Sequence, residues 1–121
     1  MGTRRFATVD VFTDRAFGGN PLAVVLEADG LESAQMQSVA SEFNYAETTF
    51  VCSPRVATHT AQVRIFTPRR EVPFAGHPNV GTALVLAHEL GARGAAVPEL
   101  FEFEEAAGVV PVRLIRNANG V

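Results

Sequence analysis

Glu47 is the carboxyl in this sequence that is best placed to carry a proton. It stands between Tyr45-Ala46 and Thr48-Thr49, an uncharged stretch at the expected start of a β-strand. A carboxyl held out of bulk water has a raised pKa, so it can both accept and return a proton near neutral pH. The alternative is an ordinary solvated glutamate at a strand end, which composition alone favours.

His77 lies in the segment GHPNVG, at the expected N-terminus of a helix. Backbone N–H groups and the positive end of the helix dipole attract a carboxylate there, and glycine lets a ligand approach the backbone closely. We therefore expect this segment to bind a small acid through Gly76, Asn79, Val80 and Gly81. The alternative is that His77 only caps a buried helix.

Two further residues could bind or react. Asn20, in a Gly-Asn-Pro turn, can bind a polar group of a substrate or, as we favour, its own backbone. Cys52 is the single cysteine, so it cannot supply a pair of thiols, and its apolar strand neighbours are typical of a buried, inert thiol. We leave Cys52 out of the predicted site.

No metal and no cofactor are expected. His59, His77 and His88 lack the spacing of metal ligands, and the glycines form no dinucleotide-binding fingerprint. All ten basic residues are arginine, so no lysine can form a Schiff base with a carbonyl substrate or with pyridoxal phosphate.

Charge and hydropathy argue against nucleic acid and membranes as partners. The formal net charge is -3 and the arginines are scattered along the chain. The longest apolar run, around Ala83 to Ala87, is far shorter than the ~20 residues that cross a bilayer. Because the N-terminal residues show no signal peptide, we predict a cytoplasmic protein.

The elements that would position these residues alternate between strand and helix. Hydrophobic periodicity predicts the first two strands, paired as a hairpin, then an amphipathic helix and two more strands. In chain order they are Phe6–Phe12, Leu22–Leu26, Met36–Phe43, Thr48–Cys52 and Ala61–Ile65. A second helix over Val80–Leu90 is apolar on nearly all sides and should be surrounded by protein.

The ends of that second helix carry sequence signals. Pro78 suits the first helical position, and Gly91 suits the position just past the C-terminus. Two last strands follow, Leu100–Glu104 and Val109–Arg116, with Glu102 and Glu104 able to face Arg113 and Arg116. The chain then reaches the hairpin signal Asn119-Gly120 and stops, which suggests a chain that has been cut.

Four stretches read together carry a resemblance to a known family. They are VDVFT with GNPLAVV (Val9–Thr13, Asn20–Val25), AETTFV (Ala46–Val51), VRIFTP (Val63–Pro68) and EVPFAGHPNVGTA (Glu71–Ala83). In this order they resemble the PhzF-like isomerases of phenazine biosynthesis, which have the diaminopimelate-epimerase fold. The resemblance implies an α+β fold of two similar halves, each a mixed or antiparallel sheet wrapped around a buried central helix. Residues 1–121 would form one N-terminal domain.

The resemblance also implies roles for residues. The family's acid/base is the glutamate of its Glu-(Ser/Thr)-x-Phe motif, which falls on Glu47. Its histidine that positions or protonates the substrate falls on His77. The implied activity is cofactor-independent isomerisation or epimerisation of a small carboxylated substrate by proton transfer. No residue here matches the aspartate that the family's second half supplies. We therefore expect a need for the missing C-terminal half, or for a second copy in a dimer.

Two other functions remain open at this point. The first is a non-catalytic, half-length binding or assembly domain of the same fold. The second is a small thiol enzyme centred on Cys52, which requires a reactive thiol.

Overall fold

The computed structural model describes residues 5–11 and 20–113 and has the α+β fold that the sequence predicts. Within these residues, seven strands form one mixed sheet in the order β1-β2-β3-β4-β6-β7, with β5 paired to β4 beside this path. The strands are β1 (Phe6–Val11), β2 (Asn20–Val25), β3 (Glu47–Cys52), β4 (Ala61–Phe66), β5 (Glu71–Val72), β6 (Leu100–Glu105) and β7 (Gly108–Arg113). The helices are α1 (Ser33–Phe43) and α2 (Gly76–Ala92).

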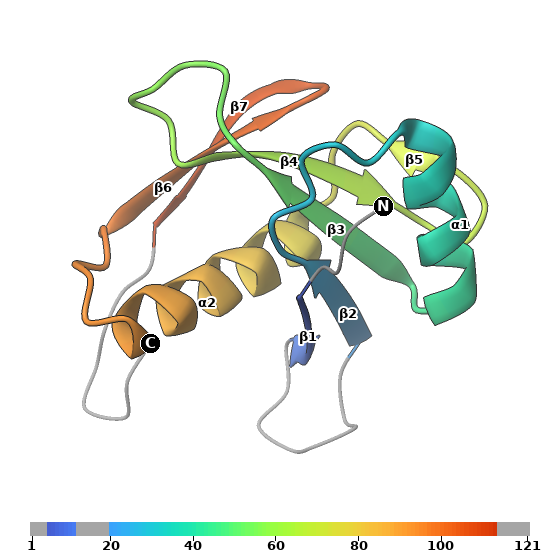
Figure 1. Ribbon diagram of the computed structural model, residues 1–121, viewed down its shortest axis with the longest axis horizontal. Helices are drawn as coiled ribbons and strands as arrows, with labels where there is room; N and C mark the ends of the chain where they lie inside the picture. Colours follow the sequence, from blue (N-terminus) through green and yellow to red (C-terminus); the bar gives the residue numbers. More distant parts are fainter. Residues whose placement is uncertain (1–4, 12–19, 114–121) are drawn as a thin grey trace.

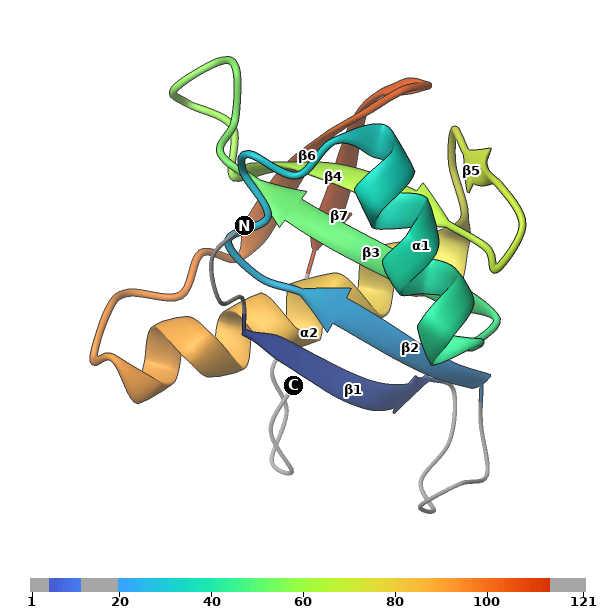
Figure 2. The same cartoon turned by 45° about the vertical axis from the view of Figure 1, so that its right-hand side comes forward.

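The sheet separates the two helices, as Figures 1 and 2 show. Met36 and Ala40 of α1 pack with Phe50 and Phe66 on one face of the sheet. On the other face the sheet curves around α2, which contacts β1, β2, β3 and β7. The larger core lies on this side, because buried residues of α2 pack there against β2, β4 and β6. The expected sheet wrapped around a central helix is confirmed.

The start of β3 is directed toward α2 by strand geometry. Side chains alternate between the two faces of a strand, so Glu47 shares a face with Thr49. Thr49 Oγ1 lies 2.8 Å from Oγ1 of Thr82 in α2, and both threonines are fully buried. The parallel pairing of β2 with β3, which places Leu22 beside Glu47, fixes this end of β3 within the sheet.

Helix α2 is longer at both ends than the sequence signals predict. It begins at Gly76, so Pro78 is its third residue and not its first. Proline is still tolerated there, because the N–H groups of the first turn have no intrahelical partner. The helix also runs past Gly91 to Ala92, and the left-handed glycine that follows it is Gly94, with φ of 73°.

The hairpin of β6 and β7 forms as predicted, and Arg113 lies opposite Leu100, so neither Glu102 nor Glu104 lies directly opposite an arginine of the described residues. Glu102 lies opposite Pro111, and Glu104 lies opposite Val109. Strand register alone decides this, since the turn places Glu105 opposite Gly108. Arg116 and the predicted turn at Asn119-Gly120 lie outside the described residues.

Candidate active site

Glu47 and His77 are far apart in the sequence but meet at the N-terminus of α2. Glu47 Oε1 lies 2.5 Å from His77 Nε2, and each side chain is 18% exposed. The two atoms face each other at ion-pair distance without the alignment of a hydrogen bond. Glu47 is the first residue of β3 and His77 the second residue of α2. The fold thus places a carboxyl and an imidazole together in a partly exposed position, with the two contacting atoms themselves buried.

The first turn of α2 can accept an anion. A helix begins with backbone N–H groups that have no carbonyl four residues earlier to bond. The N-cap residue, Ala75, makes no side-chain cap bond to them. A Cβ atom placed on Gly76 would meet nothing within 4 Å, so the space beside this residue is open. These features and the helix dipole favour a carboxylate next to the Glu47–His77 pair.

The other predicted binding residues lie in different settings. Val80 is half-buried, and Gly81 is buried within α2, where a small residue serves packing. Asn79 is only 2% exposed, and its Nδ2 lies 3.4 Å from Oε1 of Glu105. Asn20 is the first residue of β2, and its side chain lies outside the described part of the structure.

Glu105 is a candidate functional residue that the sequence analysis missed. It ends β6 and is half-buried against the first turns of α2. Burial raises the pKa of Glu105 to about 7, although the hydrogen bond from Asn79 opposes the rise. The signal was present in the sequence, because Phe101, Phe103 and Glu105 alternate with polar residues and must share the inner face.

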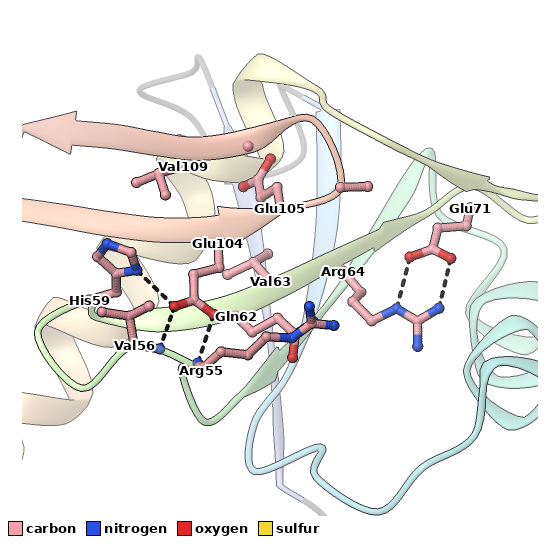
Figure 3. Close-up of a pocket in the computed structure, with 12 residues that line it drawn as sticks. Arg55, Val56, His59, Gln62, Val63, Arg64, Glu71, Glu104, Glu105 and Val109 are labelled. Atoms are coloured by element: carbon pink, nitrogen blue, oxygen red, sulfur yellow. Dashed lines mark hydrogen bonds and ion pairs between the residues drawn. The ribbon is translucent and has the colours of Figure 1, made fainter.

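Glu104 and Glu105 both line a hollow of about 670 Å³, shown in Figure 3, where their side chains point in opposite directions. Glu104 accepts hydrogen bonds from the backbone N–H groups of Arg55, at 2.7 Å, and Val56, at 2.9 Å. It also lies 2.7 Å from His59 Nδ1. The two backbone bonds are the main cause that lowers the pKa of Glu104 to about 2. Glu104 therefore acts as a clamp that holds the loop after β3 against β6.

The geometry does not favour a thiol enzyme. Cys52 is half-buried at the end of β3. Burial, helped by the charge of Asp29 and opposed by Arg64, raises the pKa of the Cys52 thiol. A raised pKa lowers the fraction of thiolate, which is the nucleophilic form.

The described residues contain no group of three or more His, Cys, Asp or Glu side chains that could hold a metal ion. They also contain no helix that is both long and apolar enough to cross a membrane.

Comparison with known proteins identifies the family of this chain. The family model described as phenazine biosynthesis-like protein, PhzC-PhzF, matches residues 9–121. The chain belongs to this family. A solved structure of a predicted epimerase from Pseudomonas aeruginosa matches 98% of the chain with a TM-score of 0.82 and 35% identity. A PhzF-family protein from Bacillus anthracis matches 96% of the chain with a TM-score of 0.77 and 34% identity.

Several curated relatives of this PhzF-family chain are named isomerases. An uncharacterised isomerase of Mesorhizobium japonicum is 50% identical over 113 residues, which are 93% of this chain and 36% of that protein. The trans-2,3-dihydro-3-hydroxyanthranilate isomerase of Pseudomonas fluorescens is 49% identical over 81 residues, which are 67% of this chain and 29% of that enzyme. The chain thus spans about a third of the length of these relatives, and 40% of the Pseudomonas aeruginosa structure.

Proposed function

We propose that this PhzF-family chain forms one half of a cofactor-independent isomerase in which Glu47 transfers a proton on a small carboxylated substrate. The observation that carries the proposal is the 2.5 Å contact of Glu47 Oε1 with His77 Nε2 beside the open first turn of α2. A base and an anion site then lie next to each other. A substrate bound there by its carboxylate presents its neighbouring carbon atoms to Glu47.

The reaction balances without an oxidant or a reductant. The Glu47 carboxylate takes a proton from a carbon of the substrate, the electron pair of that C–H bond forms a new double bond to the next carbon, and the neighbouring double bond shifts along the conjugated system. The protonated Glu47 then returns the proton to the far end of the conjugated system, so substrate and product are isomers. His77, through its contact with Oε1, orients the carboxyl for both steps. Positioned acid/base groups of this kind contribute typically about 10²–10⁴-fold to the rate.

The name of the Pseudomonas fluorescens relative supplies a substrate to test. Trans-2,3-dihydro-3-hydroxyanthranilate is a small ring with one carboxylate, which matches an anion site at a helix N-terminus. We propose a substrate of this class for the complete protein that contains this chain.

The test is solvent deuterium incorporation by the complete protein, with trans-2,3-dihydro-3-hydroxyanthranilate as substrate. We expect Glu47→Gln to lower incorporation by about 10²-fold or more, because glutamine has nearly the same shape but cannot titrate. Glu42→Gln is the matched control, since Glu42 is exposed on α1 and lies away from α2. Wild-type incorporation by the Glu47→Gln protein would show that another group is the base.

Three other expectations stay predictions. They are a cytoplasmic location, the docking of a second half or a second copy, and the non-catalytic binding domain as the rival function. If the wild-type protein incorporates deuterium into the substrate no faster than buffer alone does, the non-catalytic binding domain is favoured.

A further inference from the structure

Asn79 and Glu105 form a contact that is incomplete if Glu105 is ionised. Asn79 Nδ2 donates to Glu105 Oε1 at 3.4 Å. The second oxygens of both groups, Asn79 Oδ1 and Glu105 Oε2, are buried and have no hydrogen-bond partner among the described residues. A carboxylate has only acceptors, so it cannot satisfy Asn79 Oδ1. Two buried acceptors without a donor are costly, and a proton on the carboxyl supplies the donor that the pair lacks.

No neighbouring charged group accounts for the raised pKa of Glu105. The contact with α2 is made by the neutral carboxamide of Asn79. His77, two residues earlier in α2, pairs instead with Glu47. The charged or titratable side chains that line the hollow beside it come from the loop after β3 and from β4, β5 and β6, and they are Arg55, His59, Arg64, Glu71 and Glu104. Four of these are engaged with one another, as the pairs His59–Glu104 and Arg64–Glu71. Figure 3 shows both pairs directed away from Glu105.

We infer that Glu105 is a protonated positioning residue that clamps the first turn of α2. Its neutral carboxyl accepts from Nδ2 of Asn79 and donates its O–H to Oδ1, as a carboxylic acid and a primary amide do when they pair. The clamp is made at neutral and lower pH and opens when Glu105 ionises. Burial raises the pKa of Glu105 to about 7, which places the change within the physiological range.

The clamp bears on catalysis through its place in α2, and this part rests on the proposed function. Asn79 lies in the turn that presents His77 and the anion site. Ionisation of Glu105 removes one hydrogen bond from that turn and brings a negative charge near the site of a negatively charged substrate. We therefore expect KM to rise with pH through the range in which Glu105 titrates.

The sign of the pH effect on stability follows from the two pKa values. The pKa of Glu105 is about 7 in the folded protein and 4.5 in a model peptide, so the folded state binds more protons between these pH values. The contribution of Glu105 to stability is complete below pH 4.5 and is lost as pH rises through about 7. Glu105→Gln stays neutral and can keep both bonds to Asn79, so this contribution becomes independent of pH.

The first experiment compares melting temperatures of the complete protein at pH 5.5 and pH 8.5. We expect the wild type to lose about 4–8 °C between these pH values relative to Glu105→Gln. The comparison isolates Glu105, because every other titratable group is the same in both proteins. Glu99→Gln, which removes an exposed carboxylate just before β6, should behave as the wild type. An equal loss in the wild type and in Glu105→Gln would overturn the inference.

A second variant separates pairing from burial. Glu105→Met has similar length and no polar atoms, so it tolerates burial but leaves Asn79 Oδ1 without a donor. We expect Glu105→Met to melt below Glu105→Gln at both pH values. In ¹⁵N NMR spectra the side-chain amide of Asn79 should titrate with Glu105 in the wild type and not in Glu105→Gln. An Asn79 amide signal that does not move between pH 5.5 and 8.5 would refute the clamp.

The catalytic part has its own readout. In the wild type KM should rise by about tenfold between pH 6 and pH 8, whereas in Glu105→Gln the rise over this range should be lost. A KM that rises equally with pH in both proteins would mean that Glu105 does not affect substrate binding. That result would not bear on the assignment of Glu47 as the base. Conversely, wild-type activity of Glu47→Gln would refute the proposed base, while the stability and NMR results on Glu105 would still decide the clamp.

Discussion

The buried hydrogen bond between Thr49 and Thr82 ties β3 to α2 directly behind the proposed site. Thr49 lies two residues after Glu47, and Thr82 lies in the second turn of the helix that carries His77. Both threonines are 0% exposed, so no solvent can replace a lost partner. We expect Thr82→Val to lower the free energy of unfolding by about 1–3 kcal/mol, because it leaves a buried hydroxyl unsatisfied. That is a large share of the ~5–15 kcal/mol that stabilises an ordinary domain.

A double-mutant cycle tests the reason for this loss. Thr49→Val should cost about as much as Thr82→Val, whereas the double variant should be close to the wild type, since both polar groups are then removed together. The expected coupling between the two sites is about 1–2 kcal/mol. Urea unfolding followed by circular dichroism provides the measurement, with a fall in midpoint of about 1 M for each single variant.

Additive losses in the double variant would refute the argument, because they would mean that the two hydroxyls do not depend on each other. The same variants also report on the site. If this bond positions Glu47 relative to His77, the single variants should lower kcat of the complete protein more than they raise KM.

Two further predictions concern the loop after β3 and the end of that strand. Glu104→Gln should lower the urea midpoint at pH 7. Because the pKa of Glu104 is lowered to about 2 from 4.5, the wild type should lose this advantage as pH falls through that range. Equal urea midpoints of the wild type and Glu104→Gln at pH 7 would show that Glu104 does not hold the loop after β3 in place. Cys52 should react with iodoacetamide in the native protein many times more slowly than in urea, because burial raises its pKa; equal rates would revive the thiol enzyme.

Periodicity predicted the elements of this fold better than their ends. The alternation around Phe6–Phe12 and Ala61–Ile65, and the apolar run of the second helix, each reflect burial on a face, and each element is present in the structure. The predicted ends of α2 were wrong because proline and glycine restrict the backbone without fixing the residue at which a helix begins or ends. Pro78 fits any place in the first turn, and the glycine in the left-handed conformation is Gly94, three residues after Gly91.

The site was predictable only where a local motif carries it. Glu47 and His77 could each be singled out from their neighbours, but their contact arises from tertiary packing of β3 against α2 and could not be read from spacing. Glu105 was missed for a different reason. In the sequence it is one of three acids near a strand end, and only the alternation along β6 separates it from Glu104, which is directed to the opposite face.

The first two turns of α2 are held from two sides, and this bears on how precise the site can be. On one side Thr82 bonds Thr49 of β3, and on the other Asn79 contacts Glu105 at the end of β6. His77 belongs to the same helix end, so a shift of this end would change the 2.5 Å contact with Glu47 on which the proposed proton transfer depends. The Thr49–Thr82 support does not titrate, whereas the Glu105 support does. If both act on the same helix end, opening the Glu105 clamp at high pH should be more damaging in Thr82→Val than in the wild type. Equal pH dependence of KM in the two proteins would mean that the two supports act independently.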